Sequence, residues 1–156
     1  MKKLLGIPAI LMITFLLSCN TGKIYEEHKT NFPKFRWDKS NIVEFTPEII
    51  DIENNYQLIV AIRHIFGFNL SGLKIKVEII APSGKETTAD YTLSFYNNEN
   101  DLLSKCIGDF CDFEQVIEND FTFNETGTYK INIHHQMDQN PIPNIMEVGL
   151  IIKNAE

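Results

Sequence analysis

The chain has 156 residues, and its 14 basic and 21 acidic side chains give a formal net charge of −7 at pH 7. A chain this acidic lacks the basic face that neutralises phosphates, so we expect no nucleic-acid partner, and it disfavours electrostatic attachment to anionic lipid. Its length suits one domain with its own core and is too short for two.

Residues 1–18 have the composition of a lipoprotein signal peptide. Lys2 and Lys3 give a positive start, and residues 4–17 are almost wholly apolar. That run has about the length of a secretory h-region and falls short of the roughly 20 residues that span a bilayer. The sequence LLSC, which ends at Cys19, resembles the bacterial lipobox.

The lipobox-like motif predicts that Cys19 is the lipid-attachment site and the first residue of the mature chain. The alternative is an uncleaved N-terminal anchor in which the cysteine is incidental. One acyl chain anchors a protein only marginally, whereas two or three would hold it on a membrane. Removing Lys2 and Lys3 from the 14 basic residues leaves 12 against 21 acidic ones, a formal charge of −9 for the mature chain. We therefore expect the attachment to be covalent.

Residues 19–31 are polar and lack periodicity, so we expect a short tether there, followed by a single domain over residues 32–156. Pro33 excludes a helix through the start of this domain, and residues 42–45 suggest a first short strand. Two interpretations are open for the aromatic side chains nearby, which could form a sugar-stacking platform or anchor the N-terminal segment onto the domain. These side chains are Phe32, Phe35 and Trp37.

The clearest strand prediction covers residues 56–64, YQLIVAIRH, because β-branched and aromatic residues favour a pleated, half-buried surface. Apolar side chains fall on both alternating faces, so we expect this strand to be central in its sheet. Residues 73–80 alternate strictly between apolar and charged side chains, which predicts one buried face and one face in water. The expected buried face consists of Leu73, Ile75, Val77 and Ile79.

Turn and strand signals alternate along the rest of the chain. Residues 81–85 carry the Pro and Gly of a turn, and an Asn/Asp cluster suggests that residues 97–105 begin one helical turn. No segment has a helical apolar stripe, so the pattern predicts an all-β fold, an antiparallel β-sandwich of jelly-roll or immunoglobulin-like type. The remaining strands are expected at residues 91–95, 113–118, 120–123, 127–135 and 146–153.

Two cysteines remain in the expected mature chain after Cys19. Cys106 and Cys111 lie five positions apart, and an exported protein occupies an oxidising compartment, so we expect a disulfide between them. Free thiols and a zinc site are the alternatives. Zinc is disfavoured because the spacing is wider than a C-x-x-C knuckle and no second Cys/His pair with ligand spacing follows.

The sequence has no recognisable catalytic constellation. His134 and His135 are adjacent on an expected strand and leave it on opposite faces, and we interpret them and His64 as strand-end or surface side chains. Carboxylate pairs such as Asp109 and Asp112 are interpreted as acidic solvated loops. Nothing resembles a nucleophile elbow, a P-loop or a dinucleotide fingerprint. We therefore predict a protein that is not an enzyme and needs neither a metal nor a small-molecule cofactor.

Three stretches of the chain resemble the gliding-motility lipoprotein GldH family of Bacteroidetes. They are YQLIVAIRH…FNLSGLKIKVEIIAPSGK, FNETGTYKINIHHQM and NPIPNIMEVGLIIK, in this order. The resemblance depends most on Arg63, on the pair Asn69 and Leu70, and on residues 141–145 and 148–150. The lipobox and the length of the mature chain also agree.

The resemblance implies a non-enzymatic envelope lipoprotein tied to gliding motility and to the secretion machinery that overlaps with it. The leading hypothesis is a lipid-anchored adaptor or assembly factor with protein partners in the envelope. The alternative is a carbohydrate-binding surface lipoprotein. No acidic run directly follows Cys19, which favours the periplasmic side of the outer membrane.

The loop between the two best strands is our candidate docking segment. It carries Phe66 and Phe68 beside two glycines, and exposed aromatic side chains are common anchors at interfaces. The competing interpretation is that both phenylalanines plug the end of the sandwich.

Overall fold

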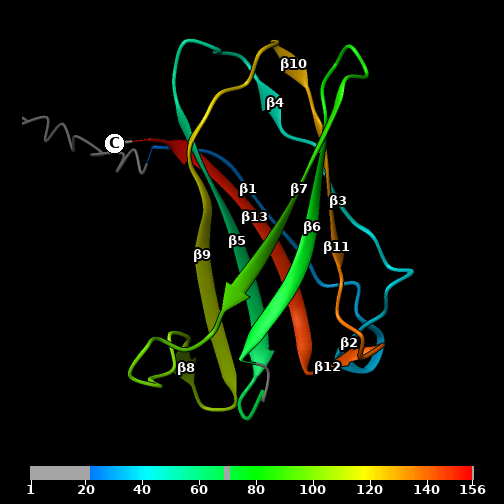
Figure 1. Ribbon diagram of the computed structural model, residues 1–156, viewed down its shortest axis with the longest axis vertical. Helices are drawn as coiled ribbons and strands as arrows, with labels where there is room; N and C mark the ends of the chain where they lie inside the picture. The colour runs from blue at the N-terminus through cyan, green and yellow to red at the C-terminus, as the bar shows by residue number, and fades with distance from the viewer. Residues whose placement is uncertain (1–21, 69–70, 156) are drawn as a thin grey trace, which may run out of the picture.

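The computed structural model describes residues 22–68 and 71–155 and has the form of an antiparallel β-sandwich (Figure 1). A five-stranded sheet faces a four-stranded sheet, and two short two-stranded ladders flank them. The all-β prediction is confirmed. Cys19 and the expected signal peptide lie outside the described residues. Within the described part of the chain, no helix is long and apolar enough to cross a membrane.

The five-stranded sheet has the order β1-β13-β5-β9-β8. Its strands are β1 (Lys23–Lys29), β13 (Ile145–Asn154), β5 (Tyr56–Ile65), β9 (Phe110–Phe121) and β8 (Lys105–Ile107). The four-stranded sheet has the order β3-β11-β6-β7. Its strands are β3 (Val43–Phe45), β11 (Lys130–His135), β6 (Gly72–Ile80) and β7 (Glu86–Ser94). One small ladder pairs β10 (Gly127–Thr128) with β4 (Glu48–Ile49), and the other pairs β12 (Ile142–Pro143) with β2 (Arg36–Trp37). A short 3-10 helix (Pro33–Phe35) precedes β2.

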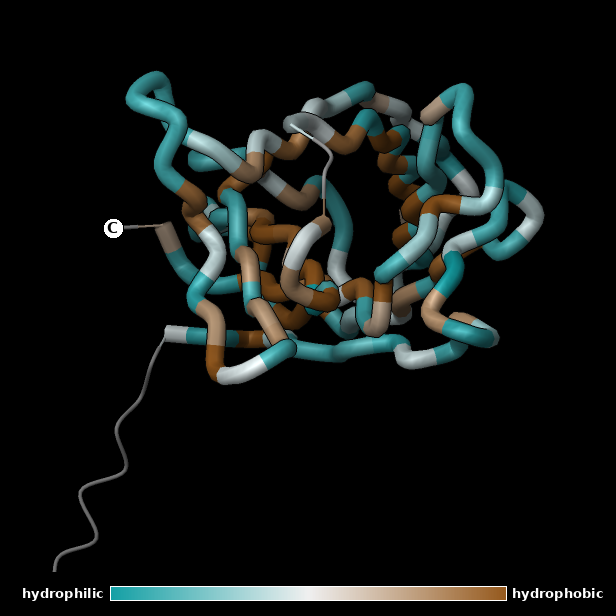
Figure 2. Tube along the Cα trace, turned by 90° about the horizontal axis from the view of Figure 1, so that it is seen from below, coloured by the Kyte–Doolittle hydropathy of each residue, from teal (hydrophilic) through white to brown (hydrophobic). Residues whose placement is uncertain are grey.

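The hydrophobic core lies between the two large sheets. Seen from below, the molecule shows hydrophobic positions gathered on the inner sides of the two layers and hydrophilic positions on the outside (Figure 2). The alternation predicted for β6 is confirmed, because its apolar side chains are all buried in this core. They are Leu73, Ile75, Val77 and Ile79.

Strand β5 is central, as predicted, with β13 on one side and β9 on the other. Its inner face contributes Tyr56, Leu58, Val60 and Ile62 to the main core. On the outer face, Ile59 and Ala61 form a small second cluster with Ile151 of β13. The coverage of both faces explains why the apolar residues of this strand do not alternate.

The expected tether over residues 19–31 is wrong for its second half. Residues 23–29 form β1, which pairs antiparallel with β13 along Lys23↔Lys153 to Lys29↔Val148. The strand is polar because it lies at a sheet edge with few buried side chains, and charged edge strands discourage unwanted pairing with other chains. The folded domain therefore begins near Gly22, whose carbonyl accepts a hydrogen bond from the Asn154 N–H (3.0 Å).

The expected helical turn at residues 97–105 is also wrong. Asn97 Oδ1 accepts hydrogen bonds from the N–H groups of Glu99 (2.9 Å) and Asp101 (2.8 Å). This side-chain bonding gives the backbone a turn in place of a helix, which is the competing use of an Asn/Asp cluster. The two short strands expected at 113–118 and 120–123 are mostly one long strand, β9.

The aromatic residues at the start of the domain act as an anchor. Trp37 is fully buried and donates its indole N–H to the Asn41 carbonyl (2.9 Å), and Phe32 packs against its ring at 5.9 Å. Only Phe35 is exposed. A sugar-stacking platform needs exposed rings, so the basis of the carbohydrate-binding alternative is absent at Phe32 and Trp37.

Candidate functional site

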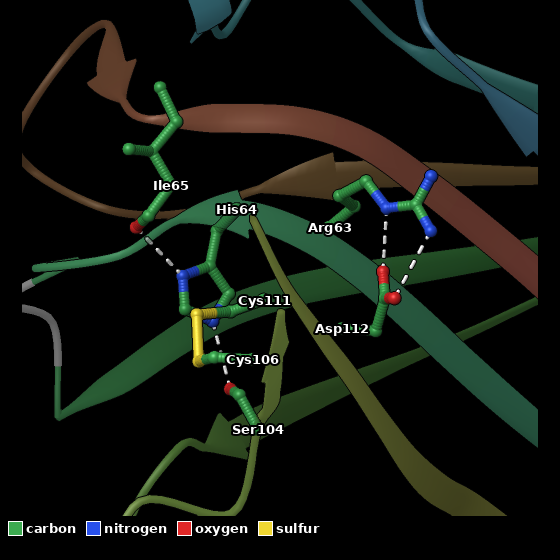
Figure 3. The surroundings of a disulfide bond; sticks show 7 residues. All are labelled: Arg63, His64, Ile65, Ser104, Cys106, Cys111 and Asp112. Carbon is green, nitrogen blue, oxygen red and sulfur yellow. Dashed lines mark hydrogen bonds and ion pairs between the residues drawn. A yellow bond between two sulfur atoms is a disulfide. The ribbon is translucent and has the colours of Figure 1, made fainter. Parts of the chain in front are cut away.

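The candidate site lies at the end of the sandwich where β8 and β9 form a hairpin. Gly108 and Asp109 connect the two strands, and Gly108 has φ = +61°, a conformation that glycine adopts readily. Cys106 and Cys111 face each other across the hairpin and are joined by a disulfide, with their Cα atoms 4.0 Å apart. The bond ties the three-residue edge strand β8 to its neighbour β9 in the five-stranded sheet (Figure 3).

Three large apolar side chains stand exposed around this hairpin. The exposed fractions are 63% for Phe66, 85% for Ile107 and 53% for Phe110. Ile107 and Phe110 are direct cross-strand partners, and the Phe66 N–H donates to the Asp109 carbonyl (2.8 Å). We call Phe66, Ile107 and Phe110 the hairpin patch. Folding does not bury these side chains, and the disulfide and ladder hydrogen bonds hold their backbone in place.

Phe68 lies behind the hairpin patch, inside the sandwich. It is 3% exposed, and its ring centroid lies 5.0 Å from that of His64 and 5.0 Å from that of Phe95. The hypothesis that Phe66 and Phe68 both dock is therefore wrong for Phe68, which closes this end of the core. Phe66, two residues earlier, is the exposed member of the pair.

His64 is buried at the end of β5, so the strand-end interpretation agrees with the structure and the surface interpretation does not. Its Nδ1 lies 3.1 Å from the Ile65 carbonyl, which can only accept, so Nδ1 carries the proton. Nε2 then accepts a hydrogen bond from the Ser104 hydroxyl (2.8 Å, Figure 3). Burial among aromatic rings lowers the pKa of His64, so the ring is neutral at pH 7.

Arg63 lies beside the hairpin on the outer face of the five-stranded sheet. It binds Asp112 through two nitrogens, with Nε–Oδ1 at 2.6 Å and Nη2–Oδ2 at 3.1 Å, and Nη1 reaches Glu147 Oε1 at 3.0 Å. Both partners are its direct neighbours on the adjacent strands. The pairing raises the pKa of Arg63, chiefly through Asp112, and lowers the pKa of Asp112. The guanidinium is thus held between β9 and β13.

His28 of β1 lies next to this ion-pair group. Its Nδ1 is 3.8 Å from Glu147 Oε2, and its Nε2 is 3.5 Å from Glu26 Oε1. The ring rests on Gly149, where a Cβ would lie only 2.6 Å from His28 Nδ1. Gly149 is therefore needed for β1 to place this side chain on the sheet.

These residues line a shallow hollow of about 230 Å³ on the outer face of the sheet. Its charged residues are four carboxylates, one guanidinium and one imidazole, namely Glu26, Asp112, Glu114, Glu147, Arg63 and His28. The excess of carboxylates suits a basic side chain of a partner. We call this group the acidic hollow. Among residues 22–68 and 71–155, no group of three or more His, Cys, Asp or Glu side chains is arranged to hold a metal ion.

The adjacent histidines of β11 leave it on opposite faces, as expected. His134 is partly exposed, whereas His135 is 4% exposed and packs edge-on against Trp37 at 5.2 Å. Burial and the nearby Lys39 lower the pKa of His135. His135 is thus the last residue of β11 and part of the packing around Trp37, a strand-end side chain that is not on the surface.

The sequence prediction identified part of this site and missed the rest. Cys106, Cys111 and Phe66 were named, but Ile107 and Phe110 were not, although an apolar residue on each side of a Gly-Asp turn is a readable signal for exposed hairpin side chains. Arg63 was named only through the family resemblance. Its role could not be read from the chain because Asp112 and Glu147 lie 49 and 84 positions away.

Comparison with known proteins identifies the family of the chain. A family model described as GldH lipoprotein matches residues 23–152, from β1 into β13. A gliding motility lipoprotein GldH homolog from Christiangramia forsetii is 27% identical over 94% of this chain and 93% of its own length. Because the family match spans both large sheets and most of the chain, this chain belongs to the GldH lipoprotein family.

Proposed function

We propose that this protein is a lipid-anchored envelope adaptor that binds protein partners of a motility or secretion machinery and catalyses no reaction. The observation that carries the proposal is the hairpin patch, where Ile107 and Phe110 are exposed on a hairpin closed by a disulfide and Phe66 is exposed beside them. Rigid exposed aromatic and aliphatic side chains are the usual anchors of protein interfaces because little conformational entropy is lost on binding. The link to motility rests on the name of the similar Christiangramia protein.

The anchor in this proposal is an acyl-modified Cys19 on the periplasmic side of the outer membrane. Membrane association is implied by the lipoprotein family. The choice of leaflet rests on the residues after Cys19, which read Asn-Thr-Gly-Lys and contain no acidic run. Two or more acyl chains at one cysteine give stable attachment without any transmembrane segment.

The chemistry of the two neighbouring surfaces describes the partner. The hairpin patch can bind an apolar surface of the partner. The acidic hollow beside it can bind a basic side chain at the edge of that interface. A buried apolar centre with charged groups at its edge is the ordinary arrangement of a protein interface, in which the charges contribute to specificity and association rate. We therefore expect a protein partner with an apolar patch flanked by Lys or Arg.

The anchor is tested by metabolic labelling with a fatty-acid analogue. Wild-type protein should carry the label and Cys19→Ala should not, because the thiol that receives the lipid is gone. A Cys19→Ala protein that keeps its label would refute the assignment of the anchor.

The docking surface is tested by combining Phe66→Ser, Ile107→Ser and Phe110→Ser in one chain. These side chains are exposed, so the variant should fold and reach the membrane but lose the envelope proteins that crosslink to wild type. The matched control combines Phe35→Ser, Ile42→Ser and Val116→Ser, which are exposed at 46%, 49% and 43% elsewhere on the molecule.

The two variants separate docking from general surface effects. If the control keeps the crosslinked proteins and the hairpin variant loses them, the patch is the docking surface. A folded hairpin variant that retains every crosslinked protein contradicts the proposal, as does loss of the same proteins by the control.

A further inference from the structure

A second group of exposed apolar side chains lies at the end of the sandwich opposite the hairpin patch. Ile50 is 84% exposed, Ile52 is 43% exposed and Ile24 is 41% exposed. Ile24 and Ile50 line an open hollow of about 650 Å³ together with Asn154 and other residues. In Figure 1 this end carries β4, β10 and the chain entering β1, while β8 and the start of β9 lie at the other end.

The described part of the chain begins at this end, at Gly22. The Gly22 carbonyl is hydrogen-bonded to the N–H of Asn154, which lines the hollow. Cys19 precedes Gly22 by three residues, and three residues of extended chain reach at most about 11 Å. Because β1 is part of the sheet and no long tether separates it from Cys19, the anchor limits how the domain can turn relative to the bilayer.

We infer that this end of the sandwich lies on the bilayer that holds the acyl chains of Cys19, with Ile50 and Ile52 in the headgroup region. This inference rests on the anchor in the proposed function. It gives the exposed isoleucines at this end a lipid neighbour, while the hairpin patch at the opposite end faces protein. Apolar side chains at the level of the headgroups add contact area to a covalent anchor.

The charges around the isoleucines specify the kind of lipid. Glu48, Asp51 and Glu53 flank Ile50 and Ile52 along the chain. Carboxylates near a membrane surface are repelled by anionic headgroups over about a Debye length. We therefore assign this surface to a zwitterionic bilayer, such as one of phosphatidylethanolamine.

The test uses the full lipidated protein in phosphatidylcholine/phosphatidylethanolamine vesicles that contain a photoactivatable phosphatidylcholine. After illumination, mass spectrometry should find lipid adducts on residues 48–55 and not on residues 103–110. The variant Ile50→Ser with Ile52→Ser should lose these adducts. The control Ile42→Ser with Val116→Ser should keep them, and phosphatidylglycerol in place of part of the lipid should reduce them.

Each outcome bears on a separate statement. Adducts confined to residues 48–55 support the orientation. Acylated protein with no adducts there, or with adducts on the hairpin, overturns the orientation and leaves the anchor in place. An intact mass that shows no acyl chain at Cys19 overturns the anchor, and the orientation with it.

Discussion

Phe66 and Phe68 occupy one turn and have opposite environments, which explains why the sequence did not separate docking from plugging. Gly67 lies between them with φ = +84°, so the regular alternation of a strand does not continue through this point. The side chain of Phe68 enters the core and that of Phe66 stays in solvent. The aromatic residues alone predict both possibilities.

We expect Phe68→Ser and Phe66→Ser to have different effects on folding. Phe68→Ser leaves a cavity beside His64 and Phe95, so the free energy of unfolding should fall by about 3–5 kcal/mol. Phe66→Ser removes an exposed side chain and should change it by less than about 0.5 kcal/mol. Denaturant unfolding of both variants checks this. Equal losses would contradict the assignment of Phe66 to the surface.

His64 makes the stability of the protein depend on pH. An unfolded chain protonates this ring near its ordinary pKa of about 6.5, whereas burial lowers the pKa in the folded state. Below about pH 6.5 the unfolded state therefore binds more protons, and the free energy of unfolding falls by up to about 1.4 kcal/mol per pH unit. His135 contributes with the same sign because its pKa is also lowered.

The contribution of His64 is measured by comparing wild type with His64→Gln at about pH 7.5 and about pH 5.5. Glutamine can donate to the Ile65 carbonyl and accept from Ser104, but it takes up no proton. The drop in stability between the two pH values should therefore be smaller in the variant. An unchanged drop would show that His64 does not titrate differently in the folded and unfolded states.

Strands with one or two apolar faces were predictable, and the polar edge strands were not. Strand β6 could be located from its clear alternation, and β5 from its continuous run of β-branched and apolar residues. Strand β1 has no apolar period because its pairing with β13 depends on backbone hydrogen bonds and on the fit of His28 over Gly149. Such long-range partners leave no local pattern in the chain.

The same alternation would have placed His64 in the core. His64 continues the inner face formed by Leu58, Val60 and Ile62, and an uninterrupted strand of period two buries it. The interpretation of His64 as a strand-end or surface residue did not use this alternation. The buried ring donates a hydrogen bond to the Ile65 carbonyl and accepts one from the Ser104 hydroxyl. Ser104 is 40 positions away, so this second partner could not be predicted from the sequence.

The β8–β9 hairpin should lose stability when its disulfide is removed. Closing a loop of this size contributes about 2 kcal/mol by the chain-entropy model, so Cys106→Ala with Cys111→Ala should lower the free energy of unfolding by about that amount. Thiol titration of denatured mature protein from the envelope should find neither cysteine free. Two free thiols would contradict the bond.

The hairpin patch and the exposed isoleucines Ile50 and Ile52 lie at opposite ends of the sandwich, near β8 and β4 respectively (Figure 1). The described chain begins at Gly22, beside Asn154, and the proposed anchor precedes it by three residues, while the hairpin patch lies at the far end. A domain anchored at one end can present the other end to a partner away from the bilayer. The sequence predicted the class of fold and the family. It could not predict this division, because Gly22, Ile50 and Asn154 meet only in the folded chain.

The central claim is that the anchored protein acts by docking through the hairpin patch. The most direct test replaces Phe110 with a photo-crosslinking phenylalanine analogue in living cells, with the same analogue at Phe35 as the control. Phe35 is exposed to a similar extent, 46% against 53%, so the two positions differ mainly in location. We predict discrete adducts with envelope proteins from position 110 and none of these adducts from position 35. No adduct at position 110, or the same adducts at both positions, would contradict the account.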